Sequence, residues 1–267
     1  MQTGYSWDTG LIRKLNEDSV FSTSFELQTH EGTVQAGLFA VADGMGGHNA
    51  GEVASALAIR SFSTECLYGL LAADPAGTLA IMAGALTKAN SDVLEAASDR
   101  SLQGMGTTLT AAVISGQDMF VAHIGDSRCY IINERETLQV TRDHSVVQQL
   151  VDAGMITQEQ ARVHPRRNEI TRVLGYARDA SPDLIHIKIF AGDNIMLCSD
   201  GLYSVLPDEK IAGSVLDAAN LMQACKDLTD QANLAGGPDN ISVIMVQPEN
   251  LPSWQAIITA HTSVRTK

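Results

Sequence analysis

Residues 107–141 hold four apolar stretches separated only by short turn-forming segments. The stretches are 107–114, 119–124, 128–132 and 138–141. Strands this close in sequence can pair only as antiparallel hairpins, because a parallel crossover needs a dozen or more residues. This part of the chain therefore excludes a sheet built from strand–helix–strand units.

The rest of the chain alternates between groups of strands and groups of helices. Further strands are predicted at 19–27, 35–42, 183–190, 194–198 and 241–246. Helices are predicted at 49–71, 75–97, 145–153, 157–162, 207–216 and 218–234. This order favours an α+β fold with antiparallel sheets and segregated helices. We expect one domain over 1–247 and a C-terminal tail over 248–267.

Composition excludes several classes of protein. Hydrophobic residues make up 45% and charged residues 18% of the chain, so it can bury a core. Its formal net charge of -13 argues against binding to nucleic acid or to anionic membranes. The sequence has neither the ~20 consecutive apolar residues of a membrane span nor a signal-peptide pattern at its start. We expect a cytoplasmic enzyme.

Four aspartates each lie beside an apolar stretch. They are Asp43, Asp126, Asp200 and Asp239. Any one Asp-Gly pair is more often a simple turn. However, Asp43-Gly44 and Asp200-Gly201 are followed by helical pattern or loop, and Glu17 and Asp18 supply further acid. A carboxylate at a strand end is costly to bury unless it is paired or binds a cation, and clustered oxygen ligands suit Mg²⁺ or Mn²⁺ rather than zinc.

The glycine-rich segment Gly44-Met45-Gly46-Gly47 has two interpretations. It could cradle a phosphate, but it lacks the Lys-Ser/Thr of a P-loop and the spacing of a dinucleotide loop. Its glycines are better explained by close approach of the backbone to a bound ion.

Seven ordered motifs resemble the bacterial branch of the metal-dependent PPM (type 2C) protein serine/threonine phosphatases. The first two are Gly10-x-x-Arg13-x-x-Asn16-Glu17-Asp18 and Val41-Ala42-Asp43-Gly44-Met45-Gly46-Gly47-His48. The others are Gly106-Thr107-Thr108, Gly125-Asp126-Ser127-Arg128, Thr171-Arg172-Val173-Leu174-Gly175, Cys198-Ser199-Asp200-Gly201-Leu202 and Gly237-Pro238-Asp239-Asn240. Together they extend from residue 4 to about residue 247.

This resemblance implies a four-layer α/β/β/α sandwich with two Mn²⁺ or Mg²⁺ ions between the sheets at one end. By position, the metal ligands would be Asp43, Gly44, Asp200, Asp239, Asp126 and Glu17. Asp43 would bridge both ions, Gly44 would offer its carbonyl, and Asp126 would help to hold a third ion. Glu17 or Asp18 would act mainly through bound water. The implied reaction is direct attack on a phosphoserine or phosphothreonine by a hydroxide that bridges the ions.

Arg13, His48 and Asp18 are the residues assigned to catalysis. The Arg13 guanidinium would clamp the phosphate through parallel hydrogen bonds. His48 is either the general acid for the leaving oxygen or a helix-entry residue that only orients water. His123 is interpreted as a core histidine, and His144 is expected to help start a helix.

An arginine-rich segment extends from Arg162 to Arg178 in this acidic chain. It is either an ordinary solvated face or a mobile flap beside the active site that steers anionic phosphopeptides. The expected partners are phosphorylated proteins that are substrates of a serine/threonine kinase, and we expect the chain to be a monomer. Two alternatives remain: a phosphatase dedicated to one phosphoserine regulator, or a non-catalytic module that binds phosphoproteins or senses metal.

Overall fold

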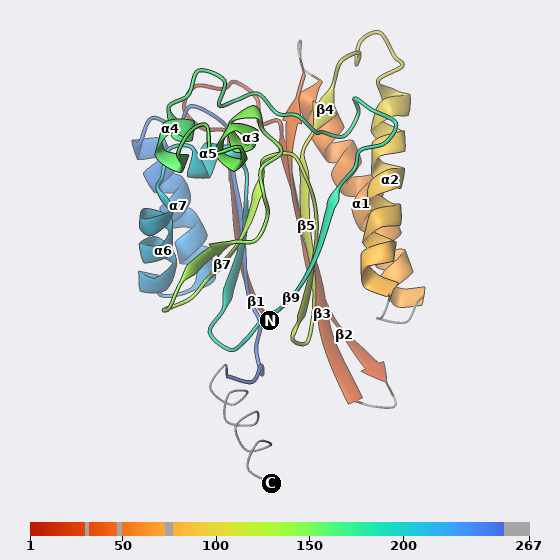
Figure 1. Cartoon of the computed structure of the whole chain (residues 1–267). Helices are drawn as coiled ribbons and strands as arrows, with labels where there is room; N and C mark the ends of the chain where they lie inside the picture. The colour runs from red at the N-terminus through yellow and green to blue at the C-terminus, as the bar shows by residue number, and fades with distance from the viewer. Residues whose placement is uncertain (30–31, 47–49, 73–76, 254–267) are drawn as a thin grey trace.

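Two antiparallel sheets form the centre of the molecule in this computed structural model, which describes residues 1–29, 32–46, 50–72 and 77–253 (Figure 1). Sheet A contains β1 (Gln2–Asp8), β7 (Arg128–Ile132), β8 (Thr137–Gln139), β10 (Asn194–Cys198) and β11 (Ile241–Gln247). Sheet B contains β2 (Asp18–Thr29), β3 (Gly32–Met45), β4 (Gly106–Thr107), β5 (Leu109–Ser115), β6 (Asp118–Ile124) and β9 (Asp183–Lys188). The strand orders are β1-β11-β10-β7-β8 and β2-β3-β5-β6-β9, with β4 paired to β3.

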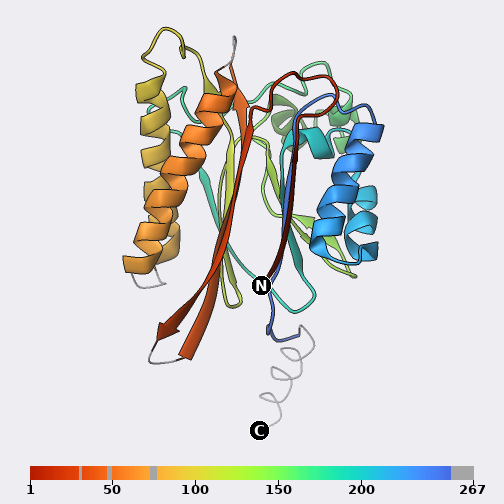
Figure 2. The same ribbon diagram turned by 180° about the vertical axis from the view of Figure 1, so that it is seen from behind.

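Helices cover the outer face of each sheet. The described residues form α1 (Gly51–Ala72), α2 (Thr78–Ala96), α3 (Val146–Asp152), α4 (Gln158–Arg162), α5 (Asp200–Tyr203), α6 (Asp208–Asp217) and α7 (Leu221–Leu234). The pair α1 and α2 lies against sheet B, and α6 and α7 lie against sheet A (Figures 1 and 2). The predicted four-layer sandwich is confirmed.

Alternation along the central strands explains the layers. In β3, Leu38 and Ala40 face the helices of sheet B, whereas Phe39 and Val41 face sheet A. Successive side chains of a strand point to opposite faces, so a strand that is apolar at every position is covered on both sides. The apolar run 35–42 that predicted a buried strand has this arrangement.

Two differences from the predicted element boundaries have a clear cause in the structure. Asp43 does not follow its strand, because β3 continues through Gly44 and Met45, which pair with β4. The helix predicted from residue 218 begins at Leu221, since the Asn220 side chain caps it by accepting a hydrogen bond from the Gln223 backbone at 2.9 Å. The starts predicted at 49 and 75 lie outside the described residues.

The start of the predicted tail contacts the domain. The Met1 amino group donates to Glu249 Oε2 at 2.8 Å, and the Ala191 backbone donates to the Pro252 carbonyl at 3.2 Å. Residues 254–267 lie outside the described part, so the boundary at 247 stays a prediction. Of the helices that the structure describes, none combines the length and the apolar character needed to cross a membrane.

Candidate active site

Most of the predicted site residues converge on one cleft at the end of the sandwich where β3 meets β4. The cleft has a volume of about 620 Å³, and six predicted residues line it: Arg13, Glu17, Asp43, Gly44, Asp200 and Asp239. Asp18 lies beside it as the cross-strand partner of Asp43. Asp126 borders a neighbouring cavity, and His48 lies outside the described residues.

Asp18 is a buried carboxylate held by two hydroxyl groups. Asp18 is only 3% exposed, and its Oδ2 accepts hydrogen bonds from Ser199 Oγ and Ser242 Oγ, both at 2.7 Å. Its other oxygen, Oδ1, meets no donor in the part of the chain that the structure describes. Burial raises the pKa of Asp18 to about 7, although the two hydroxyls oppose this shift.

Asp43 is fixed through its backbone, which leaves its carboxylate available to the cleft. Its N–H donates to Thr108 Oγ1 at 2.9 Å, and its carbonyl accepts from the Thr107 hydroxyl and the Thr108 N–H at 2.9 Å each. Burial and the nearby carboxylates of Asp18 and Asp200 raise the pKa of Asp43 well above its ordinary value. For Asp200, burial and Asp239 raise the pKa to about 6.

Glycine is required next to Asp43 by close backbone packing. The Gly44 N–H donates to the Glu17 carbonyl at 3.1 Å. A Cβ atom on Gly44 would lie 2.1 Å from the Gly51 carbonyl oxygen and 2.5 Å from that of Glu17. The glycine motif therefore allows β3 to approach the start of α1 and the loop before β2.

Asn240 organises the loop that carries Arg13 and Glu17. Its Nδ2 donates to the carbonyls of Thr9 and Leu15 at 2.9 and 3.0 Å, and its Oδ1 accepts from the Glu17 N–H at 2.8 Å. The sequence patterns gave Asn240 no role. Its position beside Asp239 in the last of the seven motifs was the one hint that it belongs to the site.

Arg13 reaches from this loop into the cleft. Its Nη2 lies 2.7 Å from Asp239 Oδ2, and its Nη1 lies 3.6 Å from Glu17 Oε2. The side chain stays 46% exposed, so a substrate can reach the guanidinium from solvent.

Asp126 faces an adjoining cavity of about 450 Å³ that shares Asp200 and Asn168 with the cleft. The residue is 5% exposed, and its Oδ1 has no donor among the described residues. The nearby Arg128 is engaged elsewhere: Nε and Nη2 hold Asp143 at 2.9 and 2.7 Å. Burial and Asp200 raise the pKa of Asp126 well above its ordinary value.

These carboxylates fit divalent cations. Two buried carboxylate oxygens, on Asp18 and Asp126, lack donors, and mutual repulsion helps to raise the pKa values across the cluster. In the described ranges, no three Asp, Glu, His or Cys side chains come close enough to enclose one ion by themselves. Mg²⁺-like ions do not need such an enclosing set, because they keep several waters and take only one or two carboxylates each.

The opposite wall of the cleft comes from residues 168–181, which include Asn168, Arg172 and Tyr176. Arg172 is anchored there: its Nη1 donates to the Ser181 carbonyl at 2.7 Å and to Asp183 Oδ1 at 3.0 Å. The sequence did not single out Asn168 or Tyr176, because a loop residue shows no periodic signal. Steering of substrates by this arginine-rich segment stays a prediction.

His123 and His144 both use ring nitrogens in hydrogen bonds to other parts of the protein. His123 is fully buried, with ring nitrogens 2.9 Å from Thr110 Oγ1 and 3.1 Å from the Arg142 carbonyl, as the core interpretation requires. His144 directly precedes Ser145, whose side chain caps α3, so its own part in starting the helix stays a prediction. His144 Nδ1 accepts from the Gly125 N–H at 3.1 Å.

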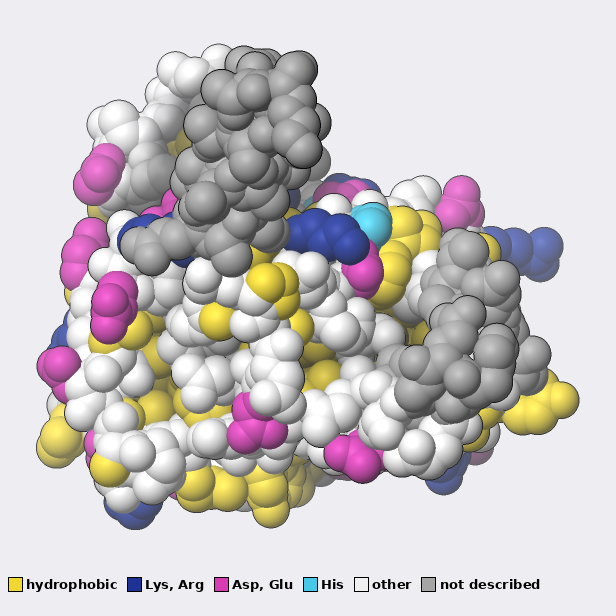
Figure 3. All heavy atoms as spheres, turned by 90° about the horizontal axis from the view of Figure 1, so that it is seen from below, with side chains coloured by type: hydrophobic (Ala, Val, Ile, Leu, Met, Phe, Trp, Pro, Cys, Tyr) yellow, Lys and Arg dark blue, Asp and Glu magenta, His cyan; other side chains and the backbone are white. Residues whose placement is uncertain are grey.

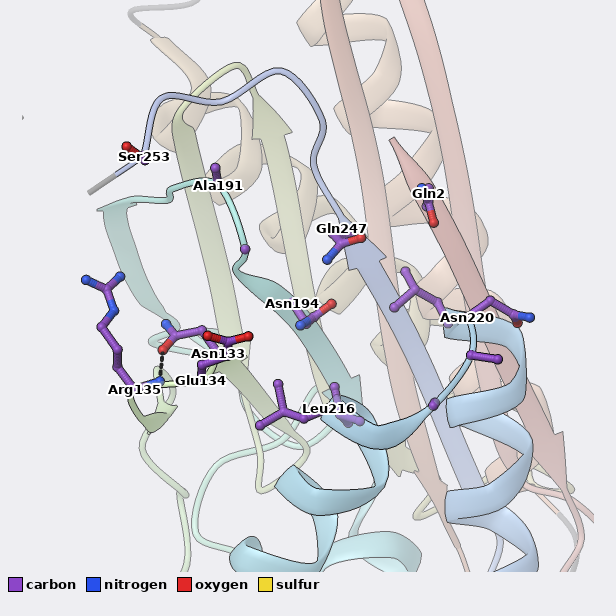
Figure 4. A pocket seen from close by; sticks show the side chains of 15 residues that line it. Gln2, Asn133, Glu134, Arg135, Ala191, Asn194, Leu216, Asn220, Gln247 and Ser253 are labelled. Atoms are coloured by element: carbon purple, nitrogen blue, oxygen red, sulfur yellow. Dashed lines mark hydrogen bonds between the residues drawn. The ribbon is translucent and has the colours of Figure 1, made fainter. Parts of the chain in front are cut away.

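A further cavity of about 560 Å³ lies on sheet A, remote from the carboxylates. Gln2 and Gln247 line it, and they pair at the opposite end of β1 and β11 from Asp239. Figure 4 shows further amide side chains around it, such as Asn194 and Asn220, together with Glu134 and Arg135. Seen from that end of the molecule, Asp and Glu side chains are dispersed singly over the surface (Figure 3). Among the described residues that line this cavity, Glu134 is the single carboxylate, so the cavity offers no group of acidic ligands for divalent ions.

Comparison with known proteins identifies relatives over nearly the whole chain. The family model described as Protein phosphatase 2C matches residues 10–241. Serine/threonine protein phosphatase PstP of Mycobacterium tuberculosis is 40% identical over 240 residues, which are 89% of this chain and 43% of that relative. This chain therefore spans less than half of PstP.

Two further similarities cover their counterparts almost completely. Serine/threonine phosphatase stp of Listeria monocytogenes is 35% identical over 92% of this chain and 96% of that protein. A crystal structure of the catalytic domain of PstP in complex with two manganese ions superposes with a TM-score of 0.77 at 36% identity, covering 92% of this chain and 97% of that one.

Proposed function

Because the chain belongs to the protein phosphatase 2C family, we propose that it removes phosphate from phosphoserine and phosphothreonine in proteins with the help of two Mn²⁺ or Mg²⁺ ions. The observation that best supports this reaction is the meeting of Asp43, Asp200 and Asp239 with Arg13 at one cleft. A carboxylate cluster can hold cations, and an adjacent guanidinium can bind a phosphate group.

Each residue of the cluster has a proposed role. Asp43, Asp200, Asp239 and the Gly44 carbonyl would hold the ions directly, and Glu17 and Asp18 through water. Asp126 would contribute to a third ion. When bound, an ion pair of this kind lowers the pKa of a water molecule and stabilises charge on the phosphoryl oxygens. Ser199 and Ser242 keep Asp18 oriented towards the cluster.

Arg13 would position the phosphate. Its contact with Glu17, at 3.6 Å, is long, and part of the guanidinium faces solvent. A phosphate oxygen pair could therefore bind the guanidinium while Asp239 holds its other edge. His48 stays the proposed proton donor to the leaving oxygen, or else a residue that orients water.

The partners and cellular setting belong to the same proposal. We infer phosphorylated proteins as substrates, supplied by a serine/threonine kinase, and a monomeric cytoplasmic enzyme. The names of the mycobacterial and Listeria relatives support the serine/threonine class.

Removal of metal is the experiment that tests the reaction. The purified chain is expected to release phosphate from a phosphothreonine peptide in Mn²⁺, to lose this activity in EDTA and to regain it when excess Mn²⁺ or Mg²⁺ is added. Phosphate release is measured with a dye assay, and circular dichroism verifies the fold in EDTA. Absence of turnover in folded, metal-loaded protein would support the non-catalytic binding module instead.

Replacing Arg13 with alanine is expected to raise KM more than it lowers kcat. A hydrogen-bonded contact to a charged group contributes about 1.5–3 kcal/mol, which corresponds to a KM increase of about 10- to 150-fold. Steady-state kinetics on the phosphothreonine peptide measure both constants. Arg13→Lys should recover part of the loss, and Lys14→Ala, on the same loop, is the matched control. A large fall in kcat at unchanged KM would contradict the clamp role.

A further inference from the structure

The loop between β1 and β2 exposes three aliphatic side chains. Leu11 is 65% exposed, Ile12 70% and Leu15 45%. Leu234, at the end of α7, is 87% exposed. Single exposed aliphatic residues are common, but several gathered at one place are typical of an interaction site. We call Leu11, Ile12 and Leu15 the apolar rim.

The apolar rim is held in place by the body of the protein. The Leu11 N–H donates to the Gly237 carbonyl at 2.9 Å, and the Leu15 carbonyl accepts from Asn240 Nδ2 at 3.0 Å. A Cβ atom on Gly237 would lie 3.0 Å from Leu11 Cγ, so this side chain lies beside the loop that follows α7. Figure 2 shows the β1–β2 loop and the loop between α7 and β11 side by side at the end of the sandwich. A surface held in this way loses little conformational entropy when a partner binds.

The apolar rim adjoins a residue that lines the cleft. Arg13 lies within the same stretch of chain, directly after Ile12, and its guanidinium contacts Asp239 at 2.7 Å. Consecutive Cα atoms are about 3.8 Å apart, so residues next to a phosphoresidue in the cleft are within reach of the side chains that flank Arg13.

We propose that the apolar rim binds an aliphatic side chain of the phosphoprotein substrate, within three residues of the phosphorylated one. This inference rests on the proposed function and adds a preference for substrate sequence. A substrate fits better than a second copy of the chain, for two reasons. Three side chains offer far less surface than the 1,200–2,000 Å² that a stable protein–protein interface commonly buries. A copy seated there would also lie next to Arg13, which directly follows Ile12 and which the substrate must reach.

Peptide pairs test the apolar rim. The enzyme variant is Leu11→Ser with Ile12→Ser, two exposed positions where serine leaves the core intact. One set of substrates is phosphothreonine peptides that carry a single leucine at one of the three positions before or after the phosphothreonine. The second set has serine in place of that leucine. The third substrate is p-nitrophenyl phosphate. Leu71→Ser is the matched control, because Leu71 is 63% exposed on α1 and contributes to neither the cleft nor the loop.

For the unmodified enzyme, kcat/KM should be about tenfold higher for at least one leucine peptide than for its serine counterpart, since covering one aliphatic side chain contributes about that factor. The double variant should lose this advantage, keep its activity on p-nitrophenyl phosphate and keep its Tm. Leu71→Ser should retain the preference.

Three results would overturn the proposal. The first is equal kcat/KM for every leucine and serine peptide in the unmodified enzyme. The second is an unchanged leucine preference in the double variant. The third is a dimer in light scattering that the double variant dissociates without any change in preference. Inactivity of the unmodified enzyme on all substrates, p-nitrophenyl phosphate included, would instead reject the proposed function, and the apolar rim proposal with it.

Discussion

Asp43→Asn is expected to abolish metal-dependent turnover while the fold persists. Asparagine has the same shape, and the hydrogen bonds of residue 43 to Thr107 and Thr108 involve its backbone, so β3 and β4 should remain paired. The change removes the carboxylate expected to bridge both ions, and with it the charge that holds them. We expect kcat to fall by at least about 10³-fold, or ~4 kcal/mol of barrier.

The stability of this variant separates a lost site from a lost fold. Asp43 lies among carboxylates that repel it, and with burial they raise its pKa well above the ordinary value. Removing one of these charges should therefore leave the metal-free Tm equal or slightly higher. Phosphate release in Mn²⁺ and thermal unfolding in EDTA measure the two effects. Asp230→Asn, at an exposed position on α7, should match the unmodified enzyme in both. Full activity of Asp43→Asn would reject the assignment of the site.

Gly201→Ala is expected to damage both stability and activity, although alanine is the better helix former. Gly201 lies in α5 directly after Asp200, and a Cβ atom there would lie 2.0 Å from the Asn240 carbonyl oxygen. The clash must move α5 away from the start of β11, which separates Asp200 from Asp239. We expect a loss of about 1–3 kcal/mol in the free energy of unfolding from overpacking. Misplacement of Asp200 should lower kcat/KM about 10²-fold.

A second glycine provides the matched comparison. Gly213 lies in α6, and nothing lies within 4 Å of a Cβ atom built there. Gly213→Ala should therefore increase stability by up to about 1 kcal/mol, as helix propensity predicts, without affecting kcat/KM. Urea unfolding and peptide kinetics on both variants test the pair. If Gly201→Ala were as stable and as active as Gly213→Ala, close packing of α5 on β11 would be contradicted.

Much of the site could be predicted from local patterns. Asp43, Asp200 and Asp239 each lie beside an apolar stretch, and apolar strands bring their ends to a common edge. The motifs then supplied the order of the ligands and the loop with Arg13 and Glu17. The residues that hold these groups in place left no comparable signal. Ser199 and Ser242 bind Asp18 across 181 and 224 positions of the chain, a separation that no short window of sequence can relate.

The sequence by itself determined the antiparallel sheets and the type of chemistry, because turn spacing, alternation and carboxylate content are local properties of the chain. Tertiary structure alone decided which groups meet. Pairing of β1 with β11 brings Asn240 to the loop of Arg13. The folded chain also places residues 168–181 at the cleft beside the carboxylates and leaves Leu11 and Ile12 exposed next to Arg13. These contacts depend on how distant strands and loops pack together, and that information is distributed over the whole chain rather than written in any one segment.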